Sequence, residues 1–272
     1  MAFFSADGRI LPARSIDSDF QLERPRPETH SNRPFFLRDV GIDPQLRLRK
    51  FIKRYQELFL NLERDCRLAN ILGGVCLPIV IPRITTKDYG EAAEFFVDAA
   101  GRSYRKTFPS RAFVNNRQGC LANNVSNAEE SRIGELLARE VNKAVTVLFF
   151  PLALQGLSVQ EMRQAIAHLP PEFVLPGVIE TSVALAMYPD ILGRDGRTPA
   201  CYCPANDYGE ETTLYFNFAD NQASFCFSAG LAKKNPRRSG GLLYAGNLLK
   251  INWATRIKRG FGRLKRLLME LN

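Results

Sequence analysis

The sequence predicts an α+β fold with a mainly antiparallel sheet, hairpins, four to five amphipathic helices and an extended N-terminal arm. Segments with apolar residues at helical spacing are mixed with segments of strict alternation, without a regular strand–helix–strand rhythm. Turn signals join neighbouring alternating segments, as in antiparallel hairpins. The chain has 272 residues, enough for a sizeable core. We divide it into an arm (1–36), an α+β body (37–230), and a basic linker with a C-terminal amphipathic helix (231–272).

The arm is predicted to be extended or disordered. Its arginines are interleaved with four prolines, Pro12, Pro25, Pro27 and Pro34. Proline disfavours helix, and the polar composition gives little apolar surface to bury. The arm is therefore expected to be disordered or to lie along the body or a neighbouring protein.

A long amphipathic helix is predicted from Asp43-Pro44 to Gly73-Gly74. Asp43 can accept hydrogen bonds from the first N–H groups, and proline suits the first helical position. Apolar residues follow at three- and four-residue spacing, from Leu48 to Cys66. The opposite face is basic and is typical of a solvated surface; it carries Arg47, Arg49, Lys50, Lys53 and Arg54.

A buried or edge strand over 75–81 and a hairpin come next. The hairpin joins 94–98 to 103–108, with Gly101 providing the positive φ of the turn. Residues 115–124 are rich in Asn and Gly and indicate a loop.

Capping boxes and residue types predict the elements from 126 to 187. Boxes at 126–129 and 158–161 each begin a helix, the first reaching about Lys143. Between them, the β-branched and aromatic residues of 145–150 indicate a central strand. A further helix is expected over 177–187.

The clearest β pattern lies late in the body. Residues 213–218 and 223–228 both alternate between apolar and polar side chains, around a turn at 219–222. This predicts an antiparallel hairpin.

Composition indicates a globular chain. Hydrophobic residues make up 45% and charged residues 24%. No window approaches the roughly 20 apolar residues of a membrane helix, and the first residues lack the pattern of a secretory signal. We therefore expect a cytoplasmic protein with free thiols at its six cysteines.

No metal or cofactor site is predicted. The gap of Cys201-Tyr202-Cys203 is shorter than zinc spacing, and the only histidines are His30 and His168. Phosphate-loop, dinucleotide-binding, nucleophile-elbow and zinc-protease motifs are absent.

Two clusters would suit an unfamiliar enzyme. Cys120 lies in a polar loop and would become nucleophilic if His168 packed beside it. An acidic loop near Cys201 and Cys203 could supply acid–base groups, Asp207, Glu210 and Glu211. A bystander thiol and a solvated turn are the alternative interpretations, so no catalytic residue is assigned.

The stretch from Glu180 to Leu192 resembles the Glu-Thr-Ser…Pro segment of creatininase-type metal-dependent amidohydrolases. It covers about 13 residues of the chain. The histidine and glycine that precede the segment in that family are replaced here by Leu175-Pro176-Gly177-Val178, and two histidines cannot supply the family's metal cluster. No functional residue is therefore transferred from the family.

The strongest functional signal is the concentration of charge at the C-terminus. The net charge is +9, and residues 230–272 hold eleven Lys and Arg against one acid, Glu270. The candidate anion-binding residues are Lys233, Lys234, Arg237 and Arg238 in a flexible linker, then Arg256, Lys258, Arg259, Arg263, Lys265 and Arg266 in the helix. The apolar side of that helix carries Trp253, Ile257, Phe261, Leu264, Leu268 and Leu271.

These features favour a non-catalytic binding or assembly component of a larger intracellular complex. Other protein subunits and nucleic acid are the expected partners, because Lys and Arg neutralise phosphates. An enzyme of unfamiliar type and a peripheral membrane protein anchored by the C-terminal helix are the alternatives. The helix could also dock on its own domain with its basic side outward.

Overall fold

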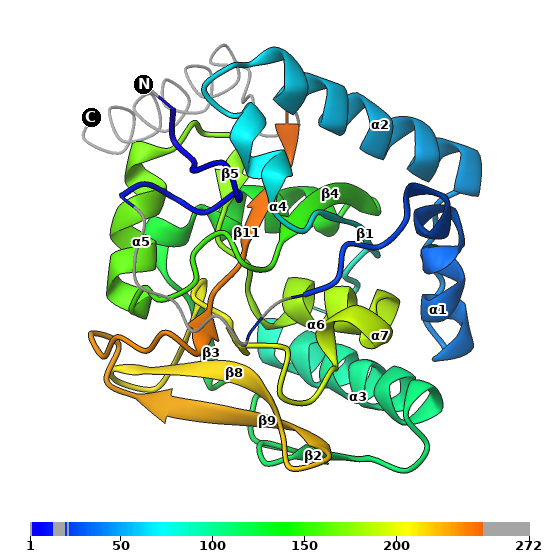
Figure 1. The fold of residues 1–272 in the computed structure, drawn as a ribbon. Helices are drawn as coiled ribbons and strands as arrows, with labels where there is room; N and C mark the ends of the chain where they lie inside the picture. The colour runs from blue at the N-terminus through cyan, green and yellow to red at the C-terminus, as the bar shows by residue number, and fades with distance from the viewer. Residues whose placement is uncertain (1, 13–19, 21, 87, 247–272) are drawn as a thin grey trace, which may run out of the picture.

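The computed structural model describes residues 2–12, 20, 22–86 and 88–246 (Figure 1). Their fold is α+β with mostly antiparallel strands, which confirms the predicted class. The strands form a four-stranded sheet in the order β1-β4-β11-β5, a five-stranded sheet in the order β10-β6-β8-β9-β2, and the pair β3-β7.

The four-stranded sheet is antiparallel and forms the centre of the core. It contains β1 (Leu77–Ile81), β4 (Val145–Phe150), β11 (Leu242–Tyr244) and β5 (Phe173–Val174). All residues of these strands are buried, as near-continuous apolar runs require. The prediction of a central strand at 145–150 is confirmed, because β4 pairs with β1 and β11.

The five-stranded sheet is built around the predicted hairpin. β8 (Thr212–Ala219) pairs with β9 (Gln222–Ala229) through a turn in which Asp220 and Asn221 have positive φ. β6 (Ala200–Tyr202) is antiparallel to β8, whereas β10 (Arg238–Ser239) and β2 (Ala112–Asn115) join at the edges in parallel. The small pair is β3 (Val125–Asn127) with β7 (Asn206–Tyr208).

Helices separate the two larger sheets (Figure 1). α6 (Val178–Met187) is buried along its whole length and packs against β1 and α3 (Tyr89–Thr107). α3 in turn contacts β2. The short α7 (Pro189–Leu192) continues from α6.

The hairpin predicted over 94–108 is wrong, because these residues belong to α3. Asp88 begins the helix by accepting a hydrogen bond from the Glu91 N–H (2.7 Å). Gly101 lies inside the helix, where a Cβ atom would come within 2.5 Å of the Phe113 ring. Close packing, and not a turn, explains this glycine.

Other helix boundaries also differ. The helix predicted from 43 to 73 divides into α2 (Leu48–Arg64) and a 3-10 helix, η2 (Ala69–Gly73). Residues 126–127 belong to β3, so the first capping box is wrong; η3 (Glu129–Ser131) and α4 (Ile133–Glu140) follow it. The second box is confirmed at the start of α5 (Val159–His168).

The described part of the N-terminal arm lies on the body. Phe4 is fully buried and its ring lies 5.7 Å from that of Phe173. The arm also becomes helical before residue 36, in η1 (Pro27–Asn32) and α1 (Arg33–Asp39). Two helices therefore occupy the predicted boundary between arm and body.

The flexible linker predicted after residue 230 is wrong for its last described residues. Arg238–Ser239 form β10, and Leu242–Tyr244 form β11 between β4 and β5. The described chain ends with Gly246 beside α2, where a Cβ atom would come within 2.6 Å of Leu58. The C-terminal helix predicted after it lies outside the described residues.

Candidate anion-binding surface

α2 holds a row of basic side chains at the surface. Its apolar side, including Phe51, Leu58 and Leu62, is buried, and the helix packs on β4. The remaining surface carries four exposed cations, Arg47, Arg49, Lys50 and Lys53. Within the part of the chain that the structure describes, these four form no ion pair with an acid. Their charge is therefore presented to solvent.

Arg54 connects this helix to the end of the described chain. Its guanidinium donates hydrogen bonds to Glu57 Oε2 and to the Ala245 carbonyl oxygen, both at 3.3 Å. Ala245 also donates its N–H to the Glu172 carbonyl oxygen at 3.0 Å. The basic segment 247–272, which lies outside the described residues, therefore follows a residue that lies next to α2.

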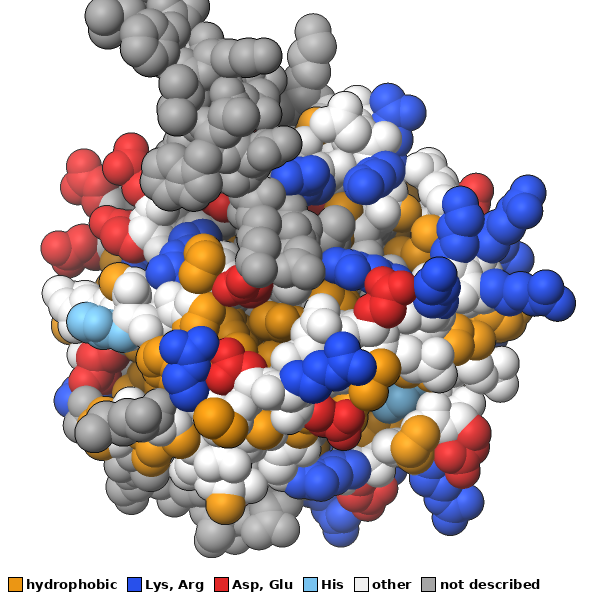
Figure 2. Space-filling model, turned by 90° about the horizontal axis from the view of Figure 1, so that it is seen from above, with side chains coloured by type: hydrophobic (Ala, Val, Ile, Leu, Met, Phe, Trp, Pro, Cys, Tyr) orange, Lys and Arg blue, Asp and Glu red, His pale blue; other side chains and the backbone are white. Residues whose placement is uncertain are grey.

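Figure 2 shows this face from above. Lys and Arg side chains gather on its right-hand side, where α2 lies in Figure 1. The amphipathic character of α2 explains this uneven distribution of basic side chains. Its apolar side is buried in the core, and only its charged side faces solvent.

The four basic residues predicted in the linker lie elsewhere, against α5 and β6. Lys234 forms an ion pair with Glu161 of α5 at 2.8 Å. The Arg238 guanidinium lies 4.9 Å from the Tyr202 ring centre, and that of Arg237 lies 5.8 Å from the Phe20 ring centre. Lys233 is exposed. Three of the four thus make contacts within the molecule.

The remaining candidates, Arg256, Lys258, Arg259, Arg263, Lys265 and Arg266, lie outside the described residues. Their placement stays a prediction.

The structure does not bring the predicted nucleophile and base together. Cys120 is exposed, with its Sγ atom 3.6 Å from the Gln118 carbonyl oxygen. His168 instead lines a groove with Phe3 and Leu11. No contact joins the two side chains in the described structure.

The acidic loop has a structural partner. Asp207 forms an ion pair with Arg163 of α5 at 2.7 Å. The neighbouring Cys201 and Cys203 are buried, and burial raises the pKa of the Cys201 thiol to about 12. Among the described residues, no group of three or more His, Cys, Asp and Glu side chains could hold a metal ion.

A buried carboxylate pair is the main polar feature that sequence reasoning missed. Glu140 of α4 and Glu180 of α6 are fully buried. Glu180 accepts a hydrogen bond from the Gly177 N–H at 2.8 Å, whereas neither oxygen of Glu140 has a partner. Burial raises the pKa of Glu180 to about 7, and burial together with Glu180 raises the pKa of Glu140 well above its usual range.

Glu180, the first residue of the stretch from Glu180 to Leu192, therefore acts as a helix cap. The spacing of Gly177 and Glu180, three residues apart at a helix start, is the signal that could have identified it.

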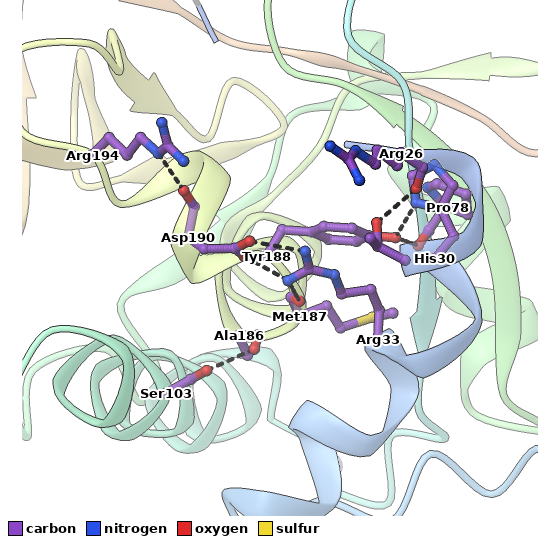
Figure 3. A network of polar contacts seen from close by, with 11 residues as sticks. Arg26, His30, Arg33, Pro78, Ser103, Ala186, Met187, Tyr188, Asp190 and Arg194 are labelled. Carbon is purple, nitrogen blue, oxygen red and sulfur yellow. Dashed lines mark hydrogen bonds and ion pairs between the residues drawn. The ribbon is translucent and has the colours of Figure 1, made fainter. Parts of the chain in front are cut away.

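A second polar network fastens α1 to the α6–α7 corner (Figure 3). Arg33 donates to both carboxylate oxygens of Asp190, at 2.5 and 2.9 Å, and to the Met187 carbonyl oxygen at 3.3 Å. His30 Nδ1 lies 3.0 Å from the Tyr188 hydroxyl, which donates to the Pro78 carbonyl oxygen at 2.9 Å. Burial, together with the charge of Arg33, lowers the pKa of His30 to about 4, so the ring is neutral at pH 7.

A cavity of about 450 Å³ opens beside this network. Its charged side chains are already paired, Arg33 with Asp190 and Lys106 with Asp39 at 2.7 Å. Ser103 is buried and donates to the Ala186 carbonyl oxygen at 2.7 Å. These pairings fit a structural role, and they leave no unpaired charged side chain among the residues that line this cavity.

No protein-family model, curated protein or solved structure matches this chain. In the described part of the chain, no helix has the length and apolar character needed to cross a membrane.

Proposed function

We propose that this protein is a non-catalytic binding component of a larger cytoplasmic complex, and that its basic surface contacts nucleic acid. The observation that carries the proposal is the position of Gly246. The predicted basic tail leaves the body beside α2, whose four exposed cations have no acidic partner among the described residues.

The geometry of α2 favours phosphates as the anion. Arg49 to Lys53 covers about 6 Å of helix, which is comparable to two steps of about 3.4 Å along a nucleic-acid strand. Arg and Lys side chains on one helix face can therefore follow a phosphate backbone.

The structure of α2 gives less support to a membrane surface as the anionic partner. An interfacial helix places an apolar side in the lipid next to its charges. The apolar side of α2 is buried against the protein core, with Phe51, Leu58 and Leu62 inaccessible. This helix can contribute charge to a ligand but has no free apolar side to insert.

Binding of fluorescently labelled oligonucleotides tests the proposal. We expect the double variant Arg47→Gln, Lys50→Gln to bind single-stranded and duplex oligonucleotides several-fold more weakly than the unmodified chain. The matched control is Arg105→Gln, Lys143→Gln, which removes the same charge from exposed residues on other segments.

Equal losses in the two variants would mean that net charge alone governs binding and would contradict a site on α2. Tighter binding to vesicles containing anionic lipid than to either oligonucleotide would replace nucleic acid by a membrane as the partner.

A further inference from the structure

An apolar groove lies between the N-terminal turn and α5, on a part of the surface that the proposed function does not use. It encloses about 610 Å³. Its walls are mainly apolar, with Phe3, Ile10 and Leu11 on one side and Leu157, Ala165 and Leu169 on the other. Leu11 is 44% exposed, so the wall offers a large apolar side chain to an occupant.

The described chain ends close to this groove. Ala245 is hydrogen-bonded to Glu172, three residues beyond the groove residue Leu169. The Tyr244 ring lies 5.1 Å from that of Phe173, which lies 5.7 Å from the ring of Phe4, the neighbour of Phe3. The end of β11 therefore lies close to the residues that form the groove.

The following segment has the length and composition to fill the groove. Trp253 is seven residues beyond Gly246 and can be reached by up to about 25 Å of extended chain. From Trp253 onward, six large apolar residues recur at helical spacing, the last being Leu271. Gly260 and Gly262 disfavour an isolated helix, so contact with an apolar surface would favour helix formation in this segment.

Another nearby segment fits the groove poorly. Residues 13–19 adjoin the groove residue Pro12, but they contain a single large apolar side chain, Ile16.

We propose that the apolar side of residues 253–271 packs into this groove of the same chain. The basic side, with Arg256, Arg259 and Arg263, is then left for an anion. Only the role of that basic side rests on the proposed function; the packing itself does not.

Trp253 reports on the packing directly, because it is the single tryptophan of the chain. In the full chain without nucleic acid, we expect its emission to be blue-shifted and protected from acrylamide. Ala165→Glu introduces a charge into the groove wall and should shift the emission to the red and increase quenching several-fold. Ala167→Glu, on the exposed side of the same helix, is the control and should change neither.

A second variant, outside α5, distinguishes loss of packing from misfolding of α5. Leu11→Asp alters the opposite wall and should give the same red shift, while far-UV circular dichroism confirms that the fold is kept. Quenching of Trp253 in the unmodified chain that equals quenching of a free 251–272 peptide would overturn the proposal.

Protection that persists in both groove variants would also overturn it. Protection that disappears on dilution would assign the groove to the tail of a second copy and contradict packing within one chain. None of these readouts involves nucleic acid, so failure here is distinguishable from failure of the α2 proposal.

Discussion

Arg33 is a charged residue that the fold buries for a structural purpose. Its guanidinium pairs with Asp190 and stacks on the Tyr188 ring, with 4.6 Å between the guanidinium carbon and the ring centre. We expect Arg33→Met to lower the free energy of unfolding by about 1–3 kcal/mol, because hydrogen bonds to a charged group are lost. Arg38→Met, at an exposed position of the same helix, should cost no more than about 0.5 kcal/mol. Urea unfolding measures both, and equal effects would refute an anchoring role for Arg33.

The carboxylate pair makes stability depend on pH. The pKa of Glu140 is raised in the folded protein, so its carboxyl stays protonated there while the unfolded chain ionises above about 4.5. Both states are protonated below that value, and the free energy of unfolding should decrease as the pH rises through it. The same holds for Glu180 between 4.5 and about 7.

Glu140→Gln tests this pair. The variant should be more stable than the unmodified chain at pH 8, and the decrease in stability from pH 4.5 to 8 should become smaller. Each pKa unit of difference between folded and unfolded states corresponds to about 1.4 kcal/mol. Gly134→Ala, at an exposed position of the same helix, removes no ionisable group and should leave the pH dependence unchanged. An unaltered profile in Glu140→Gln would show that this carboxyl is ionised in the fold.

At the scale of elements, β11 sets the C-terminal limit to which the chain can be truncated and still fold. A chain ending at residue 246 keeps β11 between β4 and β5, and we expect it to fold. A chain ending at residue 236 loses the strand that joins them and should not fold cooperatively. Thermal unfolding followed by circular dichroism distinguishes the two. A cooperative transition in the shorter chain would contradict the central position of β11.

Elements with one strong local pattern could be predicted from the sequence, and those set by tertiary packing could not. Alternation identified the hairpin of β8 and β9, and β-branched and aromatic residues identified β4. α3 was mistaken for a hairpin because aromatic residues and Gly101 resemble strands and a turn, although helical spacing runs from Phe96 to Tyr104. β11 has only three residues after two glycines, and its place depends on β4 and β5.

The basic residues of the candidate site could be predicted from the sequence, but their arrangement in space could not. Both basic segments can be read from the sequence, but a basic helix face is ordinarily just solvated. The position of Gly246 beside α2 follows from β11, which directly precedes it. Long-range strand pairing of this kind leaves no local signal. The ion pair between Lys234 and Glu161 could not be predicted from the sequence either, because the two residues are far apart along the chain.

For the whole molecule, the distribution of charge matters more than its total. The net charge is +9, yet the residues before 230 are close to neutral, with 26 basic and 27 acidic side chains. A diffuse excess would attract any polyanion weakly, whereas charge concentrated in one segment of the chain can neutralise adjacent phosphates. Binding through the proposed basic surface should therefore release counterions in proportion to the cations that touch phosphate.

The dependence of oligonucleotide affinity on salt concentration tests most directly whether the cations of α2 contact nucleic-acid phosphates. On a single strand, each phosphate contact contributes about −0.7 to the slope of log affinity against log salt. We expect Arg47→Gln, Lys50→Gln to flatten the slope of the unmodified chain by about 1.4, with the Arg105→Gln, Lys143→Gln control unchanged. An identical slope in all three proteins would contradict the claim that α2 contacts nucleic acid.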